Sequence, residues 1–393
     1  MNPEFINGPT NYAKLKGIIN GVEKEIHIFF DKHLDLNDQT ECKSFNSIDI
    51  TYYLYNLIKE SNEPLDFFME ISIKQLKDND ISNKREIYIK EVIKLFKSEF
   101  IEKNNEENLK YSKTNPNVKL HYFDIRDHLD IFFLTKIINY KIIKYLDLLK
   151  TTNENENEKN KYDDKILFYL NSINEKIDNI NENTKEVKNN KLNKYDKIVS
   201  KQKYYLDKIL NKYENENVGI NINLFLYIHC NEIINNMKSV INNMKYMIEN
   251  KFLMNFNKFD EKLDKLGEYV LQLYSLYTDA YLMRRILDKN YIKKCLVYTG
   301  NAHSVNIIFF LVKFLGFNII KIQKSVNTNT NTLIDKIKNE MFSFDIYELF
   351  LLKKVNIQCI QWEPLGLNDS ISAEFIKNKK KYMKKLNLLN LSN

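Results

Sequence analysis

The chain is poor in the residues that interrupt regular structure. It has eight glycines and five prolines in 393 residues, and no glycine lies between Gly21 and Gly219. Because glycine and proline punctuate helices and strands, this region is expected to hold long helices. No apolar run reaches the roughly 18 residues of a membrane-spanning helix, and residues 1–12 lack the apolar stretch of a secretory signal. The sequence therefore predicts an intracellular protein without a membrane span.

Cysteines and known catalytic motifs are also scarce. The cysteines Cys42, Cys230, Cys295 and Cys359 show no CxxC spacing, so reduced thiols are expected rather than a disulfide framework. The chain has no GxxxxGK[ST] phosphate loop, no GxGxxG and no HExxH, and therefore no motif for nucleotide or HExxH zinc chemistry. Its net charge of +7 is a small excess for this length, and nucleic acid is not an expected partner.

The chain does contain short apolar runs that alternate with helical patterns. The runs expected to form strands cover residues 25–30, 65–71, 118–123, 294–299 and 318–322. A helix predicted over residues 304–315 ends at Gly316, and Ser47 is a candidate N-cap of an earlier helix. Strands that alternate with helices predict an α/β fold with a central, mainly parallel sheet flanked by helices.

The middle of the chain has a different composition. Residues 151–160 are a polar, low-complexity segment, after which apolar residues recur in heptad spacing: Ile166, Leu170, Ile173, Ile177, Ile180, Thr184 and Val187. We interpret residues 151–217 as an inserted arm of long, coiled-coil-like helices that self-associates through residues 166–210. The alternative is an ordinary helix pair. The first and second parts of the α/β domain are then residues 1–150 and 218–345, followed by a strand and a lysine-rich helix in 346–393.

Polar residues follow several of the predicted strands. Binding sites in open parallel sheets form at the carboxyl ends of the strands, so these residues are candidates for one site. They are Asp31, His33, Glu70, Asp124, Arg126, Gly300 and His303. Three of them have a specific structural alternative: Glu70 in a buried salt bridge, His33 at the surface, and Arg126 paired with Asp124 or Asp127.

Three of these segments resemble a known superfamily. Phe30-Asp31-Lys32-His33, Leu65 to Glu70 and Gly300-Asn301-Ala302-His303 are similar to motifs of the superfamily of erythromycin esterases, the haem-binding lipoprotein ChaN, TraB-type proteins and Tiki metalloproteases. The resemblance covers residues 20–145 and 218–325. The chain departs from it at Phe30, where the superfamily has glycine, and at Asp31, where it has glutamate. The chain also looks like proteins of large DNA viruses of protists.

The residues and the resemblance together predict a hydrolase-like site. Glu70 would act as general base towards a water, and His33 and His303 would bind a divalent metal or orient that water. Arg126 would anchor an anionic group, with Asp31, Asp124 and Gly300 around the site. The substrate class would be a small molecule or a peptide. The alternative is a catalytically inactive structural or virion-associated protein, located in the host cytoplasm or the virion.

Lysines cluster near the end of the chain, at Lys377, Lys379, Lys380, Lys381, Lys384 and Lys385. Such clusters can bind anionic polymers, but a solvated helix face is their more common role. Truncation after Ser370 is therefore expected to leave retention on a nucleic-acid column at low salt unchanged. Earlier elution of the truncated chain would show that the tail does bind anionic polymers.

Overall fold

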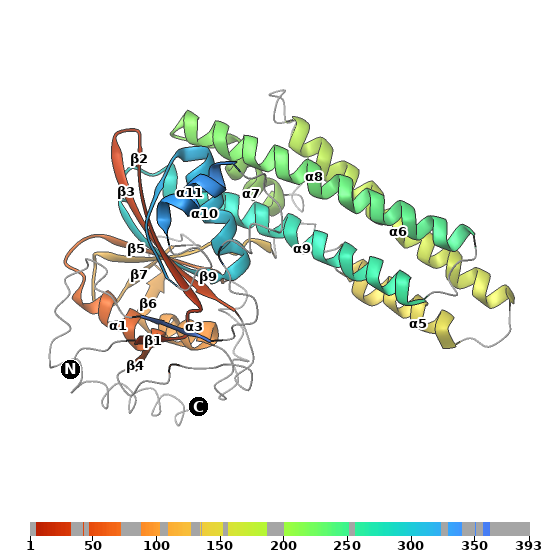
Figure 1. Cartoon of the computed structure of the whole chain (residues 1–393), viewed down its shortest axis with the longest axis horizontal. Coiled ribbons are helices and arrows are strands. Elements are labelled where there is room, and N and C mark those ends of the chain that lie inside the picture. Colours follow the sequence, from red (N-terminus) through yellow and green to blue (C-terminus); the bar gives the residue numbers. More distant parts are fainter. Residues whose placement is uncertain are drawn as a thin grey trace. The chain divides into compact units, whose positions relative to one another are not determined.

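The computed structural model describes residues 5–32, 42, 47–71, 88–102, 109–126, 134, 136–151, 156–186, 200–250, 256–323, 329–339, 350 and 357–361. The chain divides into two compact units, both drawn in Figure 1. The α/β unit contains Met1–Asp124 and Arg285–Asn393, and the helical unit contains Ile125–Arg284. The helical unit therefore begins earlier and ends later than the predicted insertion of residues 151–217.

The α/β unit is built on an eight-stranded sheet. Its four central strands are parallel to one another, and the strands on both sides of them pair antiparallel. From edge to edge the strands are β10 (Asn318–Gln323), β2 (Asn11–Ile19), β3 (Val22–Asp31), β9 (Lys294–Gly300), β5 (Leu65–Met69), β8 (Val118–Tyr122), β7 (Leu109–Ser112) and β6 (Phe100–Glu102). The α/β class agrees with the prediction, but the sheet is mixed and not mainly parallel.

The antiparallel pairing begins at a hairpin that was not predicted. β2 and β3 are joined at Asn20 and Gly21, whose φ angles of 49° and 75° are both positive. An Asn-Gly pair favours this backbone and is a strong hairpin signal between apolar strands. β10 then pairs antiparallel with β2, so the predicted strand over residues 318–322 forms an antiparallel edge.

One face of the large sheet packs against helices and a small second sheet. The helices are α1 (Ile50–Glu60) and α3 (Tyr88–Glu99), and the small sheet is β11 (Cys359–Gln361), β1 (Phe5–Asn7) and β4 (Ser47–Asp49). The large sheet contributes alternate residues to this core: Phe29, Phe67, Met69, Leu120, Tyr122, Leu296 and Tyr298. Ser47 was expected to cap a helix but lies in β4, and the helix starts only after Asp49.

The opposite face of the sheet packs against α10 (Asn301–Leu315), which contacts β3 and β9. The predicted end of this helix is confirmed, because Gly316 follows it in the left-handed conformation with φ 68°. α11 (Thr330–Asn339) packs beside α10. Strand residues on this second face are fully buried: Ile28, Phe30, Phe68 and Val297. Both faces of the central strands are therefore core.

A disulfide joins Cys42 to Cys359, which are 317 positions apart in the sequence. The expectation of reduced thiols is therefore wrong for this pair, whereas Cys230 and Cys295 are free and buried. The spacing of cysteines along the chain could not reveal the pair, since the pairing of β11 with β1, which places Cys359 beside Asn7, joins distant parts of the chain. A cross-link that closes so long a loop stabilises the folded state by up to about 5 kcal/mol in chain-entropy terms.

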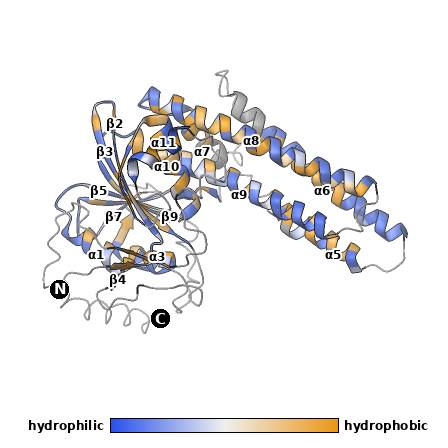
Figure 2. Cartoon of the chain, in the orientation of Figure 1, coloured by the Kyte–Doolittle hydropathy of each residue, from blue (hydrophilic) through white to orange (hydrophobic). Residues whose placement is uncertain are grey.

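The helical unit consists mainly of long helices. They are α5 (Ile143–Thr151), which follows a π-helical turn at Ile138–Ile142, then α6 (Glu156–Glu186), α7 (Ser200–Asn211), α8 (Glu216–Glu249) and most of α9 (Phe256–Leu287). Apolar positions recur along α6 between polar ones (Figure 2). Four residues of the heptad stripe are fully buried where α6 packs against α5 and α8: Ile166, Leu170, Ile173 and Ile177. These four residues pack within the chain and are not available for the predicted self-association. None of the described helices combines the length and apolar character needed to cross a membrane.

Gly17 in β2 lies against the buried ring of Phe317, and a Cβ at residue 17 would come within 2.4 Å of a ring carbon. Gly17→Ala is therefore expected to lower the free energy of unfolding by about 1–3 kcal/mol through overpacking. Gly267 in α9 is the matched control, because no described atom lies within 4 Å of an added Cβ. Gly267→Ala should raise that free energy by about 0.5–1 kcal/mol. Urea unfolding followed by circular dichroism measures both, and effects of equal sign would contradict this packing.

Candidate functional site

The carboxyl ends of the four parallel strands lie along one edge of the sheet, and several predicted site residues lie there. This edge runs across the ends of the strands and is not one of the outer strands. β3 ends at Asp31, whose partner in register is Gly300 at the end of β9. Glu70 directly follows β5, and its backbone N–H donates to the carbonyl of Tyr298 at 3.2 Å. Asp124 lies just beyond the end of β8. The parallel pairing therefore brings Asp31, Glu70, Asp124 and Gly300 to the same edge.

Glu70 and His303 form a buried pair at this edge. Nε2 of His303 lies 3.2 Å from Oε1 of Glu70, and the two residues are only 4% and 6% exposed. The other carboxylate oxygen, Oε2, accepts the Thr299 hydroxyl at 2.8 Å and the Gly300 N–H at 2.7 Å. Glu70 is thus tied to the end of β9 and to the first turn of α10. Thr299 was not among the predicted site residues, although it directly precedes Gly300 in the sequence.

The Glu70 carboxylate favours one position for the proton of His303. An ionised carboxylate can only accept hydrogen bonds, so it favours the tautomer in which Nε2, the ring nitrogen that faces Oε1, carries the proton. In the neutral ring the lone pair then lies on Nδ1. The ring of Phe123 meets the imidazole edge-on, with 6.5 Å between the ring centroids. An imidazole oriented by a carboxylate is suited to general acid–base chemistry, and the same arrangement also occurs as a purely structural ion pair.

The turn between β9 and α10 has ordinary backbone angles. Gly300 has φ −58° and ψ 155°, which any residue can adopt. This conformation therefore does not require glycine. α10 begins at Asn301 rather than at residue 304, so His303 lies in the first turn of the helix. Its side chain is for this reason close to the strand end that holds Glu70.

The other predicted site residues have different surroundings. Oδ1 of the buried Asp31 accepts the side-chain N–H of Gln358 at 3.1 Å. Arg126 belongs to the helical unit and is half-buried there. His33 lies outside the described residues, so a metal bound by His33 and His303 stays a prediction. Among the residues that the structure describes, no three His, Cys, Asp or Glu side chains are gathered closely enough to hold a metal ion.

A second carboxylate-bound histidine lies inside the sheet. Nε2 of His121 is 2.7 Å from Oδ1 of Asp66, and its Nδ1 is 3.0 Å from the guanidinium of Arg285. Because arginine only donates, Nδ1 accepts and Nε2 carries the proton. The ring of His121 stacks on Phe68 at 4.4 Å between centroids. Burial lowers the pKa of His121, although the hydrogen bond with Asp66 opposes this shift.

Two buried histidines, His27 and His121, make the free energy of unfolding depend on pH. Burial also lowers the pKa of His27, which is bound to Glu25 and Tyr12 inside the sheet. The unfolded chain binds a proton at each of these histidines near pH 6.5, whereas the folded chain does not. Their contribution to stability is therefore complete above that pH and is lost as the pH falls below it. The free energy of unfolding should decrease between pH 7 and pH 5, by at most about 1.4 kcal/mol per pH unit for each histidine.

Urea unfolding at several pH values measures this dependence, and His121→Asn should make the slope shallower. A stability that stays constant or rises on acidification would contradict the neutral state of these two rings.

The hydroxyl of Thr299 should stabilise the folded state through Glu70. Thr299→Val removes the donor but keeps the shape of the side chain, so it is expected to lower the free energy of unfolding by about 1.5–3 kcal/mol, the range for hydrogen bonds to charged groups. Ser304→Ala is the control. The Ser304 hydroxyl is equally buried but donates to a neutral carbonyl at 3.5 Å, so its loss should cost less than about 1 kcal/mol. Equal losses in urea unfolding would argue against a charged acceptor at Glu70.

Comparisons with known proteins agree with the expected likeness to proteins of large DNA viruses. "Uncharacterized protein R706" of Acanthamoeba polyphaga mimivirus is 26% identical over 89% of this chain and 93% of its own length. "Uncharacterized protein R161" of the same virus is 29% identical over 81% of this chain and 88% of its own length. A third relative, "Uncharacterized protein R129", is 36% identical over 32% of this chain and 74% of its own length. The chain is therefore of giant-virus type.

No solved structure matches the chain. A family model described as "Family of unknown function (DUF5847)" matches residues 4–260 and 251–365, which together cover nearly the whole sequence. The chain belongs to this family.

Proposed function

We propose that the α/β unit is hydrolase-like and that His303, oriented by Glu70, activates a water at the carboxyl edge of the parallel strands. The observation that carries this proposal is the buried Glu70–His303 pair. Nδ1 of His303 would take a proton from the water as the water oxygen bonds to the substrate. The imidazolium would then give that proton to the leaving group as its bond breaks. Glu70 would hold the ring and stabilise the imidazolium.

The proposal gives Glu70 a positioning role instead of the general-base role expected from the sequence. The reason is that Thr299 and Gly300 donate to one of its oxygens, and Nε2 of His303 lies 3.2 Å from the other. The resemblance to the erythromycin esterase, ChaN and TraB–Tiki superfamily supports a hydrolytic reaction through the segment from Gly300 to His303. A small-molecule or peptide substrate is part of the same proposal. A divalent metal bound by His33 and His303 is an alternative to it, because a metal at Nδ1 would leave that nitrogen unable to take a proton.

Turnover measurements test the reaction class. Wild-type protein incubated with activated carboxylic esters, phosphate esters and short peptides should hydrolyse at least one class. His303→Asn should slow this reaction by about 100-fold or more, the usual contribution of a general base. His121→Asn is the control, since His121 is also buried and bound to a carboxylate but lies inside the sheet. Equal turnover by wild type and His303→Asn would exclude His303 from the chemistry.

A tautomer measurement tests the pair without any substrate. In wild-type protein, 15N NMR should show His303 protonated at Nε2. In Glu70→Gln the amide oxygen would accept from Thr299 and Gly300, so the amide N–H₂ would face His303 and its proton should move to Nδ1. His121 keeps Asp66 and should keep its tautomer in the same spectrum. An unchanged tautomer at His303 would contradict its orientation by Glu70.

A second candidate function is a catalytically inactive structural or virion-associated protein. The Cys42–Cys359 disulfide favours this role, because disulfides persist in oxidising environments, including virion surfaces. If this role is correct, purified virus particles should contain the chain with that pair oxidised. Alkylation before reduction, followed by mass spectrometry, measures the state of the pair. Particles that lack the chain would rule out the virion role.

A further inference from the structure

We propose that Cys42 and Cys359 form a reversible thiol–disulfide site that controls the attachment of β11 and, through Gln358, the surroundings of Asp31. Reduction of the pair would release β11 from β1 while the rest of the α/β unit stays folded. The last part of this proposal is an effect of Asp31 on the neighbouring strand ends, where Glu70 and His303 lie. That part rests on the proposed function.

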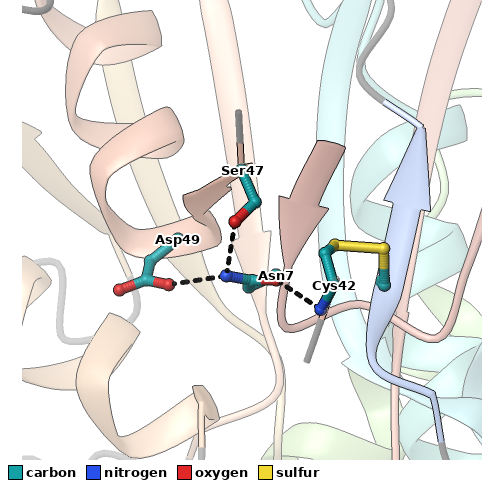
Figure 3. The surroundings of a disulfide bond; sticks show 5 residues. Asn7, Cys42, Ser47 and Asp49 are labelled. Atoms are coloured by element: carbon teal, nitrogen blue, oxygen red, sulfur yellow. Dashed lines mark hydrogen bonds between the residues drawn. A yellow bond between two sulfur atoms is a disulfide. The ribbon is translucent and has the colours of Figure 1, made fainter. Parts of the chain in front are cut away.

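Asn7 connects the disulfide to three strands. Cys359 is paired in register with Asn7 of β1. Oδ1 of Asn7 accepts the backbone N–H of Cys42 at 2.9 Å. Nδ2 of the same side chain lies 3.4 Å from the hydroxyl of Ser47 and 3.3 Å from a carboxylate oxygen of Asp49 in β4 (Figure 3). The disulfide therefore links β11 covalently to Cys42, which is itself hydrogen-bonded to Asn7. Asn7 in turn is bound to both residues named in β4.

Besides the disulfide, β11 is held by a short strand pairing and a few other contacts among the described residues. It is an edge strand of three residues that pairs with β1 alone. Outside this ladder, the N–H of Gly8 donates to the carbonyl of Gln358 at 3.0 Å, and Ile360 is the strand's residue in the hydrophobic core. A strand this short has few backbone hydrogen bonds, so the cross-link is a large part of its attachment.

Gln358 transmits the state of the disulfide to the edge of the large sheet. It directly precedes Cys359 and is fully buried, and its Nε2 donates to Oδ1 of Asp31 at 3.1 Å. Asp31 is itself buried and is the register partner of Gly300. Release of β11 would remove this donor from a buried carboxylate. A buried carboxylate that loses a hydrogen-bond donor is unfavourable, so Asp31 would become accessible to water. The carboxyl ends of the strands would then open beside Asp31.

The exchange reaction is specific to this pair of cysteines. A dithiol reductant would attack Sγ of Cys42, which is half-buried, whereas Cys359 is 6% exposed. The S–S bond breaks, Cys359 leaves as a thiolate and a mixed disulfide forms at Cys42. The second thiol of the reductant then releases Cys42 and closes the reductant's own disulfide, so that two electrons pass to the protein. Burial raises the pKa of Cys230 to about 12 and also raises that of Cys295, which keeps both thiols unreactive.

Hydrogen exchange of the full chain tests the proposal. After treatment with dithiothreitol, amides of residues 359–361 should exchange about tenfold faster or more, as expected for local opening. The Gly300 amide, which donates to Glu70, and the far-ultraviolet circular dichroism should not change. Oxidised glutathione should restore slow exchange, and Cys230→Ser should switch in the same way as wild type. Equal exchange in the two redox states, failure of the pair to oxidise, or loss of all tertiary structure on reduction would each overturn the proposal.

Gln358→Leu separates the two steps. In the oxidised variant, residues 359–361 should stay protected, while the Lys32 amide, which donates to Asp31, should exchange faster than in wild type. An unchanged Lys32 amide would remove Gln358 from the pathway. None of these measurements uses hydrolytic turnover. Absence of catalysis would therefore leave the redox result intact, and failure of the switch would leave the test of Glu70 and His303 intact.

Discussion

The pairing of β9 between β3 and β5 is the constraint on which the rest of the α/β unit depends. These three strands come from distant parts of the chain, and their parallel register fixes which residues reach the same edge of the sheet. β9 also supplies the Thr299 hydroxyl and the Gly300 amide that hold Glu70. α10 follows β9 without a linker, so the same pairing places His303. One strand thus links the core of the sheet to the candidate site.

Buried charges impose a second constraint on the same unit. Nζ of the buried Lys24 donates to the carbonyls of Ile286, Lys289 and Ile292 at 3.0, 2.6 and 2.7 Å, respectively. Glu70 meets its donors 229 and more positions away in the sequence. A buried charge without such partners is strongly unfavourable, so these contacts disfavour other ways of packing the same apolar segments. They favour one arrangement even where they add little net stability.

The sequence predicted the strand positions better than their pairing. Apolar runs identified the cores of β3, β5, β8, β9 and β10, because a buried strand requires apolar residues close together in the sequence. The direction and neighbours of a strand depend on connections elsewhere, so a mixed sheet was taken for a mainly parallel one. Glu70 and His303 were selected as strand-end residues. Thr299, Gln358 and the Cys42–Cys359 bond were missed, because each is defined by a contact between distant segments.

The position of the helical unit within the chain affects how the protein is made. Residues Met1–Asp124 leave the ribosome with β3 and β5 but without the strand that lies between them. The helical unit is synthesised next, and β9 follows only after it. During that interval β3 and β5 each expose an unpaired backbone edge, which another strand can join. The nascent chain is therefore most vulnerable to aggregation while its helices are being translated, and chaperones would be needed most at that stage.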